Sequence, residues 1–166
     1  MKAVMVDIET LSSESNAHIL QVGAVEFDTH SDWLGRGFMR NVSDKDQGRH
    51  IDPSTVRWWT KQLKYPDESY LELRSVLLEF TDFCKDTNAE ECWAHGSSFD
   101  HSVLDNARKQ LGLPVFMHYK TWRDTRTLFA LCKEFEWPNN DDKHDALADA
   151  IAQAQAVQRA IQGGMR

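Results

Sequence analysis

The N-terminal residues alternate between the two faces of an extended chain, the pattern of a β-strand with one face in a core. One face carries Val4, Val6 and Ile8, and the other carries Met5, Asp7 and Glu9. This alternation predicts a strand over residues 2–8. Further strands are predicted over residues 18–27 and 33–42, and the turn-forming segment 28–32 between them favours a hairpin.

Helical periodicity dominates the rest of the chain. It predicts helices over residues 52–64, 69–85, 99–111, 125–135 and 145–161, and short strands are predicted over residues 91–94 and 119–124. The first helix begins at Asp52-Pro53, a capping acid followed by a proline that suits the first turn. This order predicts a mixed sheet covered by helices, an α/β fold. Since no linker or repeat divides the chain, residues 1–166 are expected to form a single domain.

Composition narrows the class of protein. A hydrophobic content of 41% with 27% charged residues indicates a globular chain, and no apolar run is long enough to cross a bilayer. The N-terminus lacks the pattern of a signal peptide, so a cytoplasmic location is expected. The three cysteines (Cys84, Cys92 and Cys132) have no CxxC spacing and are expected to be buried free thiols. A net charge of −7 argues against a protein that grips long nucleic acid through many phosphates.

Asp7 and Glu9 are the first candidate site residues. Because they are two residues apart on the predicted strand, both side chains project from one face near its end. Acids at a strand end often only face solvent. Asp7, however, lies in an otherwise apolar run, where burial without a cation or a hydrogen-bond partner would be costly. The pair is therefore a candidate set of oxygen ligands.

Asp100 is a third candidate acid, at the start of the helix predicted over residues 99–111. An acid in the first turn also simply complements the helix dipole, and in isolation this explanation is favoured. The preceding Gly96-Ser97-Ser98 segment lets the backbone pass close to a ligand, which shifts the balance slightly towards a site.

His144 and Asp149 are five residues apart, a spacing that does not place them on one face of a helix. They meet if His144 precedes the helix and Asp149 lies in its second turn, with Asp145 as the capping residue. A lone loop histidine is usually solvated, so the case for His144 depends on its combination with the acids.

Four carboxylates with one imidazole suit a site for two hard divalent cations, Mg²⁺ or Mn²⁺. Two ions about 3.5–4 Å apart stabilise both the attacking and the leaving oxygen of an in-line displacement. A histidine side chain titrates near neutral pH and can take a proton from water. The combination predicts hydrolysis of a phosphodiester.

Three segments carry a resemblance to a known family: VDIET, SSFDHSVL and HDALADA. In order and separation they resemble the DEDDh group of 3′–5′ exonucleases, the DnaQ-like branch of the ribonuclease H-like superfamily. The IDPSTVRWWTKQ and TWRDTRTL segments look like a phage-associated subgroup that includes phage exonuclease A and bacterial exoribonuclease-like proteins. The resemblance implies a five-stranded mixed sheet whose second strand is antiparallel to its neighbours. It also implies Asp7, Glu9, Asp100 and Asp149 as metal ligands, Asp7 as the bridge between both ions, and His144 as the general base.

The resemblance further implies contacts with the terminal nucleotide. The candidate contacts are the backbone near Thr10 and Leu11, an apolar wedge for which Leu11 is suited, and the residues Ser98, Phe99 and Trp58. Helical spacing predicts a buried stripe formed by Val56, Trp59 and Leu63. Trp58 lies outside this stripe and is therefore freer to stack on a base. Packing in the core is the alternative for Leu11 and for at least one tryptophan.

Arg123 and Arg126 are candidates for phosphate contacts. A solvated cluster of ion pairs with Asp124 is an equal alternative.

The expected function is a metal-dependent exonuclease that releases nucleoside 5′-monophosphates from the 3′ end of single-stranded or short nucleic acid. An oligoribonuclease-like RNA trimmer and a catalytically silent module on the same fold are the alternatives. All five motif residues are present, which disfavours the silent module. The sequence leaves open the choice between DNA and RNA, and between a monomer and a homodimer. No membrane partner is expected.

Overall fold

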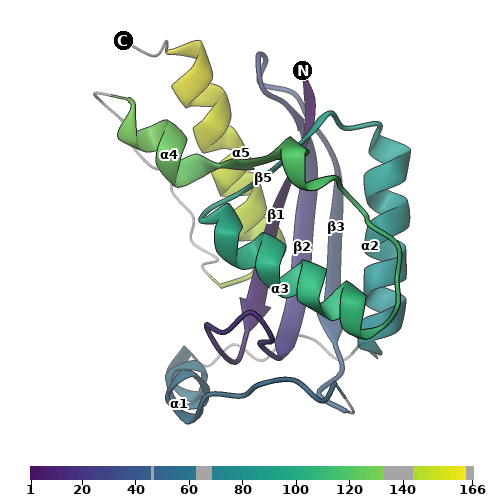
Figure 1. Cartoon of the computed structure of the whole chain (residues 1–166). Helices are drawn as coiled ribbons and strands as arrows, with labels where there is room; N and C mark the ends of the chain where they lie inside the picture. Colours follow the sequence, from purple (N-terminus) through teal and green to yellow (C-terminus); the bar gives the residue numbers. More distant parts are fainter. Residues whose placement is uncertain (46, 63–68, 133–143, 164–166) are drawn as a thin grey trace.

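One mixed sheet forms the centre of the protein (Figure 1). The computed structural model describes residues 1–45, 47–62, 69–132 and 144–163. Within them the strand order is β4-β3-β2-β1-β5-β6. The strands are β1 (Lys2–Thr10), β2 (Ile19–Asp28), β3 (Leu34–Val42), β4 (Tyr70–Leu71), β5 (Glu91–Ala94) and β6 (Trp122–Asp124). β2 pairs antiparallel with β1 and β3, whereas the pairs β1–β5, β5–β6 and β3–β4 are parallel.

The α/β class and the antiparallel second strand are confirmed, but the expected number of five strands is wrong for the described residues. The additional strand is β4, whose residue Tyr70 pairs with Asn41 at the edge of β3. The helix predicted from residue 69 begins only at Leu73. Two residues are too few to show a strand periodicity, so pairing with the neighbouring edge decided their conformation.

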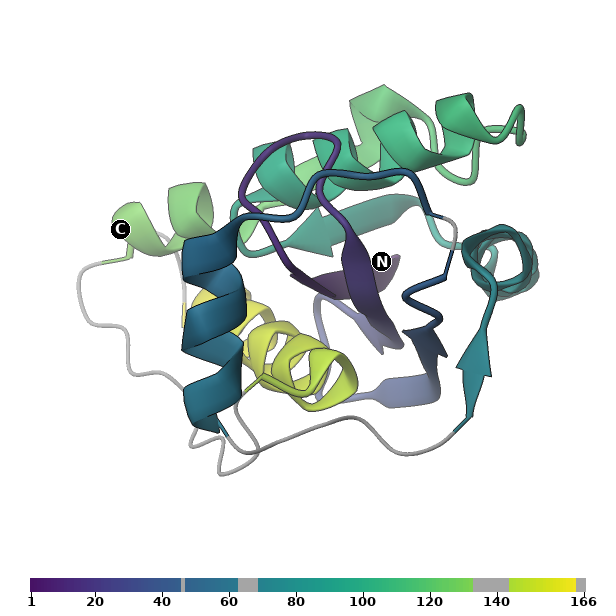
Figure 2. The ribbon, with the colours of Figure 1, turned by 90° about the horizontal axis from the view of Figure 1, so that it is seen from below.

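Helices cover both faces of the sheet (Figures 1 and 2). They are α1 (Pro53–Gln62), α2 (Leu73–Thr87), α3 (Ser97–Gln110), α4 (Thr125–Ala130) and α5 (Ala146–Gln162). α2 and α3 pack on one face, α5 with α4 packs on the other, and α1 lies beyond the end of β1 (Figure 2). A 3-10 turn occupies the first half of the strand predicted over residues 119–124.

One predicted helix end differs from the structure, and another lies outside the described residues. The helix predicted over residues 125–135 ends at Ala130, and the last described residue after it is Cys132. Residues 133–135 and the polar turn predicted over 138–143 lie outside the described residues. The predicted end of the first helix at residue 64 also lies outside them, and α1 is described as far as Gln62.

The two faces of β1 have the predicted alternation. Val4, Val6 and Ile8 belong to the apolar cluster beneath α2 and α3. Ala3 and Met5 belong to the cluster beneath α5. Towards the C-terminal end of β1, the α5-facing side carries acids in place of apolar residues, because the alternation continues through Asp7 and Glu9. The core therefore ends where the candidate site begins.

The buried stripe predicted on the first helix is wrong for the part that is described. No residue of α1 is fully buried. Val56 and Trp59 line a groove of about 550 Å³ together with Leu11, and Leu63 lies outside the described residues. α1 lies at the end of the sheet and not on one of its faces, so its apolar side has no sheet to cover it (Figure 1).

Two further expectations concern the cysteines, as buried free thiols, and the helices, none of which should span a membrane. All three cysteines are free; Cys84 and Cys92 are buried, while Cys132 is partly exposed. Among the described residues no helix combines the length and the apolar character that a bilayer span requires.

Candidate active site

The acids of β1 lie in a buried environment. Burial raises the pKa of Asp7 from 3.8 to about 7, and the charge of Asp149 adds to the shift. Burial raises the pKa of Glu9 from 4.5 to about 9, with further contributions from Asp7 and Asp149. Carboxylates that raise one another's pKa in this way lie close together without enough positive charge to compensate them.

Asp100 joins the acids of β1 from the first turn of α3. Its side chain is only 5% exposed, and burial followed by the charge of Asp7 raises its pKa well above the ordinary value. β5 runs parallel to β1, so the helix that follows β5 begins at the same end of the sheet as the acids. Gly96, which precedes α3, has a φ of 93°, and a Cβ there would lie 3.1 Å from the Arg126 guanidinium carbon. A glycine is therefore required at the turn that delivers Asp100.

The start of α5 brings His144 to Asp149. His144 has a φ of 67°, and its backbone N–H donates to Asp149 Oδ2 at 2.9 Å. Asp145 caps the helix by accepting a hydrogen bond from the Ala148 N–H at 2.9 Å, which confirms its predicted role. Asp149 lies in the first turn, not in the second as predicted, because the helix begins directly after the cap.

These segments bring the five motif residues together. Ligand atoms of Glu9, His144 and Asp149 lie within 4.8 Å of one another. Asp7 and Asp100 are not part of this group of three, but the charge of Asp7 raises the pKa of both Glu9 and Asp100, so the two acids border it. A set of mostly carboxylate oxygens with uncompensated charge is the donor set that Mg²⁺ and Mn²⁺ prefer, so the residues fit divalent cations.

Two residues of β2 fix the start of α5, and neither was identified from the sequence. A Cβ on Gly23 would overlap the backbone of Ala146 and Leu147, so helix and strand approach backbone to backbone. Gln21 Oε1 accepts a hydrogen bond from the Ala146 N–H at 2.6 Å, and its Nε2 donates to Asn41. The available signal was a glycine inside a strand pattern, which often marks a close backbone approach.

Gln153 is a further residue that sequence reasoning missed. Its Nε2 donates to Asp7 Oδ1 at 2.8 Å. It lies one helical turn after Asp149 on an alanine-rich helix, so the available signal was a polar residue on an otherwise small and apolar face.

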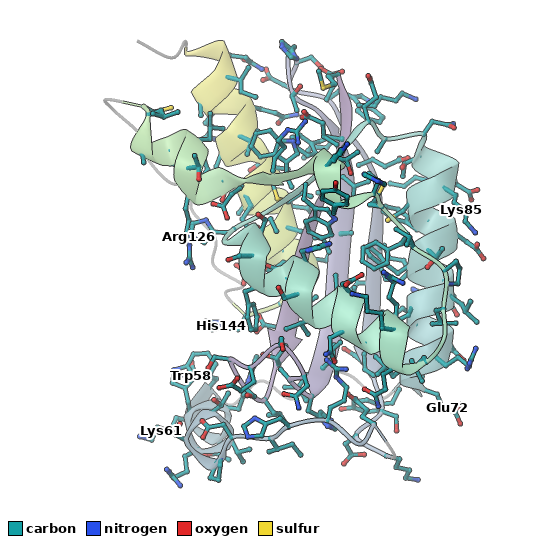
Figure 3. All side chains as sticks on the ribbon, viewed as in Figure 1. Trp58, Lys61, Glu72, Lys85, Arg126 and His144 are labelled. Atoms are coloured by element: carbon teal, nitrogen blue, oxygen red, sulfur yellow. The ribbon has the colours of Figure 1, made fainter. Side chains whose placement is uncertain are left out.

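Aromatic side chains border the acidic cluster on the side of α1. The Trp58 ring lies edge-on to the His144 ring with centroids 4.6 Å apart, and Figure 3 shows the two side by side. Trp58 remains 40% exposed. Trp59 Nε1 donates to the carbonyl oxygen of Thr10 at 3.0 Å, which ties α1 to the end of β1.

The other candidate substrate contacts lie around the same site and differ in how exposed their side chains are. The backbone of Leu11 bonds to His18 and Asp52, while its side chain lines the groove beside α1. Ser98 is exposed on the first turn of α3, but the Phe99 side chain packs against the core.

The arginines also differ from each other. Arg123 Nε pairs with Glu91 Oε1 at 2.9 Å, so its ion-pair partner among the described residues is Glu91 and not Asp124, the partner that the ion-pair alternative named. Asp124 instead caps α4 through the backbone N–H groups of Arg126 and Thr127. The Arg126 guanidinium lies over Gly96, beside the start of α3 (Figure 3).

Several solved exonuclease structures share this fold. Escherichia coli exonuclease I in complex with a dA13 oligonucleotide superposes with a TM-score of 0.69 at 16% identity, over 96% of this chain and 40% of that chain. Exonuclease I from Methylocaldum szegediense gives a TM-score of 0.73 at 13% identity, over 99% of this chain and 41% of that chain. A zinc-bound E. coli exonuclease I complex with single-stranded DNA gives a TM-score of 0.69 at 14% identity, over 95% of this chain and 40% of that chain. This chain thus spans about two fifths of their length.

The likeness confirms that the chain has the fold of these exonucleases, while the DEDDh assignment and the phage-associated subgroup stay predictions. No curated protein sequence matches the chain. Residues 2–161 match the model of the Rv2179c-like 3′-5′ exoribonuclease domain, and the chain therefore belongs to this 3′-5′ exonuclease family.

Proposed function

We propose that the protein hydrolyses phosphodiester bonds at the 3′ end of short or single-stranded nucleic acid and releases nucleoside 5′-monophosphates. The observation that carries the proposal is the group of four carboxylates and one histidine at the C-terminal end of β1. The mutual repulsion of the carboxylates destabilises the fold, but the same concentration of negative charge attracts cations.

Asp7, Glu9, Asp100 and Asp149 would hold two Mg²⁺ or Mn²⁺ ions. When bound, such ions stabilise the charge on the attacking and leaving oxygens. The residues of the chain supply the rest: rigid placement from β1, α3 and the first turn of α5, and a low-dielectric surrounding that strengthens each electrostatic contact.

His144 is the proposed general base. It takes a proton from the water whose oxygen attacks phosphorus, and the P–O3′ bond of the preceding nucleotide breaks. The released nucleotide keeps a 5′-phosphate, and the leaving 3′-oxygen takes up a proton from solvent, so the shortened strand ends in a new 3′-hydroxyl. The backbone bond from His144 to Asp149 and the flanking Trp58 ring support this role, since they hold the imidazole beside the acids.

RNA is the substrate that we favour, because the family is described as an exoribonuclease domain. An oligoribonuclease-like activity on very short RNA is the second candidate, and the acidic net charge of −7 supports a substrate held only at its end. The solved exonuclease I complexes contain DNA, so DNA belongs in the same test. A role for residues 1–166 as one exonuclease domain, a homodimer and a cytoplasmic location remain predictions.

A timed digest tests the proposal. Matched RNA and DNA oligonucleotides, single- and double-stranded, are labelled at the 5′ or the 3′ end and incubated with Mg²⁺, Mn²⁺ or EDTA. We expect a 5′-labelled strand to shorten one nucleotide at a time, and a 3′-labelled strand to release labelled mononucleotide at once. Internal cuts, or shortening from the 5′ end, would contradict the proposal. Equal rates of cleavage with EDTA and with Mg²⁺ or Mn²⁺ would show that the reaction does not need divalent cations.

A further inference from the structure

Gln153 of α5 makes the one side-chain hydrogen bond that Asp7 receives from the described residues. Its Nε2 donates to Asp7 Oδ1 at 2.8 Å, and this bond lowers a pKa that burial otherwise raises. The glutamine is only 7% exposed, while Asp7 is half-buried, so the contact lies at the edge of the core. Asp7 belongs to β1 and Gln153 to α5, and the bond therefore joins the two elements that carry most of the acids.

The orientation of the amide follows from the charge of its partner. An amide oxygen facing a carboxylate would be repulsive, so the NH₂ group must face Asp7. As a result, Gln153 Oε1 is buried and has no hydrogen-bond partner among the described residues. A buried carbonyl without a hydrogen-bond partner is destabilising, so a glutamine is not the residue that stability alone would select here.

A glutamine is suited to supporting a cation ligand. It fixes one oxygen of the carboxylate without neutralising its charge, whereas an arginine or a lysine at this position would compete with the cations. Partners of this kind orient metal ligands in other proteins, and their removal typically costs about 10–100-fold in metal affinity or activity.

We propose that Gln153 is a positioning residue for the cation site: its amide holds the Asp7 carboxylate in the orientation that binds divalent cations. The inference rests on the proposed function, because it assumes that Asp7 is a cation ligand. It assigns a role to a residue outside the three motifs, and it does so through a contact that leaves the charge of the site unchanged.

Gln158 provides a matched control on the same helix. It is also buried, and its Nε2 donates to the carbonyl oxygens of Asp28 and Trp33 at the far end of the sheet. Gln153→Met and Gln158→Met each replace the amide by an apolar side chain of similar length. Only the first change removes a bond to a candidate cation ligand.

The experiment measures Mn²⁺ binding by calorimetry together with urea unfolding in EDTA. We expect Gln153→Met to bind Mn²⁺ about ten-fold or more weakly, with stability in EDTA unchanged or slightly increased. Gln158→Met should lose stability and keep the Mn²⁺ affinity of the wild type. Equal Mn²⁺ affinity in Gln153→Met and the wild type would overturn the inference while leaving the proposed function standing. A wild-type protein that binds Mn²⁺ no better than Asp149→Ala would overturn both.

NMR spectroscopy of the wild type keeps the test independent of whether a variant folds. The side-chain NH₂ signals of Gln153 should shift when Mg²⁺ is added, and those of Gln158 should not. Unmoved Gln153 signals at saturating Mg²⁺ would also overturn the inference.

Discussion

Gly23 of β2 and Ala146 of α5 meet backbone to backbone, with no room for a side chain between them. This close approach sets how near the first turn of α5 packs to the sheet. Since that turn carries Asp149 and is preceded by His144, the glycine determines where two of the five motif residues lie.

Gly23→Ala should therefore damage both fold and activity. Overpacking typically costs about 1–3 kcal/mol, and the upper end is expected here because backbone atoms cannot change rotamer to make room. Urea unfolding measures the loss of stability, and the rate of mononucleotide release measures the loss of activity. Gly37→Ala is the matched control, since its Cβ would meet only the end of the Leu147 side chain at 3.2 Å. A Gly23→Ala protein as stable and active as Gly37→Ala would contradict this account of the helix position.

The stability of the metal-free protein should fall as pH rises from 7 to 8.5. Glu9 has a pKa of about 9 in the fold against 4.5 ordinarily, so the folded protein holds a proton that the unfolded chain has already lost. The contribution of Glu9 to the free energy of unfolding is complete below about pH 4.5 and is lost as pH rises through about 9. Histidines with lowered pKa values do not reverse this slope, because the unfolded chain releases their protons around pH 6.5.

Melting temperatures in EDTA at pH 7.0 and 8.5 measure this effect. Glu9→Gln should flatten the decrease and melt higher than the wild type at pH 8.5, while losing activity. Mn²⁺ should raise the melting temperature of the wild type more at the higher pH, because it binds the ionised carboxylates. A wild-type melting temperature that does not change between these two pH values in EDTA would show that Glu9 is not held in its protonated form.

Trp58→Ala should weaken substrate binding with little change in stability. The ring is 40% exposed and lies edge-on to His144, so its removal changes the border of the site and little of the core. Stacking of a base on an aromatic ring is worth about 1–3 kcal/mol, which predicts a rise in KM of roughly ten-fold. Trp33→Ala, at a similarly exposed position on the β2–β3 hairpin, is the control and should keep its KM. Parallel behaviour of the two variants would exclude a substrate contact for Trp58.

The same substitution, Asp to Asn, should have different effects on activity at Asp145 and at Asp149. Asp145 accepts a capping hydrogen bond that an asparagine also makes, so Asp145→Asn should keep the fold and most of the activity. Asp145→Ala should lose about 1 kcal/mol of stability. Asp149→Asn should abolish cleavage in a folded protein. Loss of cleavage in Asp145→Asn at full stability would move the ligand role to the capping residue.

The sequence predicted the features that depend on local pattern. The alternation in β1 predicted which face carries Asp7 and Glu9, and the cap at Asp145 followed from the five-residue spacing between His144 and Asp149. The features that were missed depend on tertiary contacts. Gln153 meets Asp7 across 146 residues of sequence, and α1 lies at the end of the sheet where periodicity alone could not place it. The two-residue strand β4 exists only because β3 offers it an edge.

Single-turnover cleavage of a 5′-labelled RNA at saturating Mn²⁺ tests the central claim most directly. The wild type should remove one nucleotide at a time from the 3′ end. Asp7→Asn and His144→Ala should bind the same RNA, remain folded and slow the first cleavage by several orders of magnitude and by about 10²–10⁴-fold, respectively. A wild-type rate of first cleavage in either variant would contradict the assignment of the site.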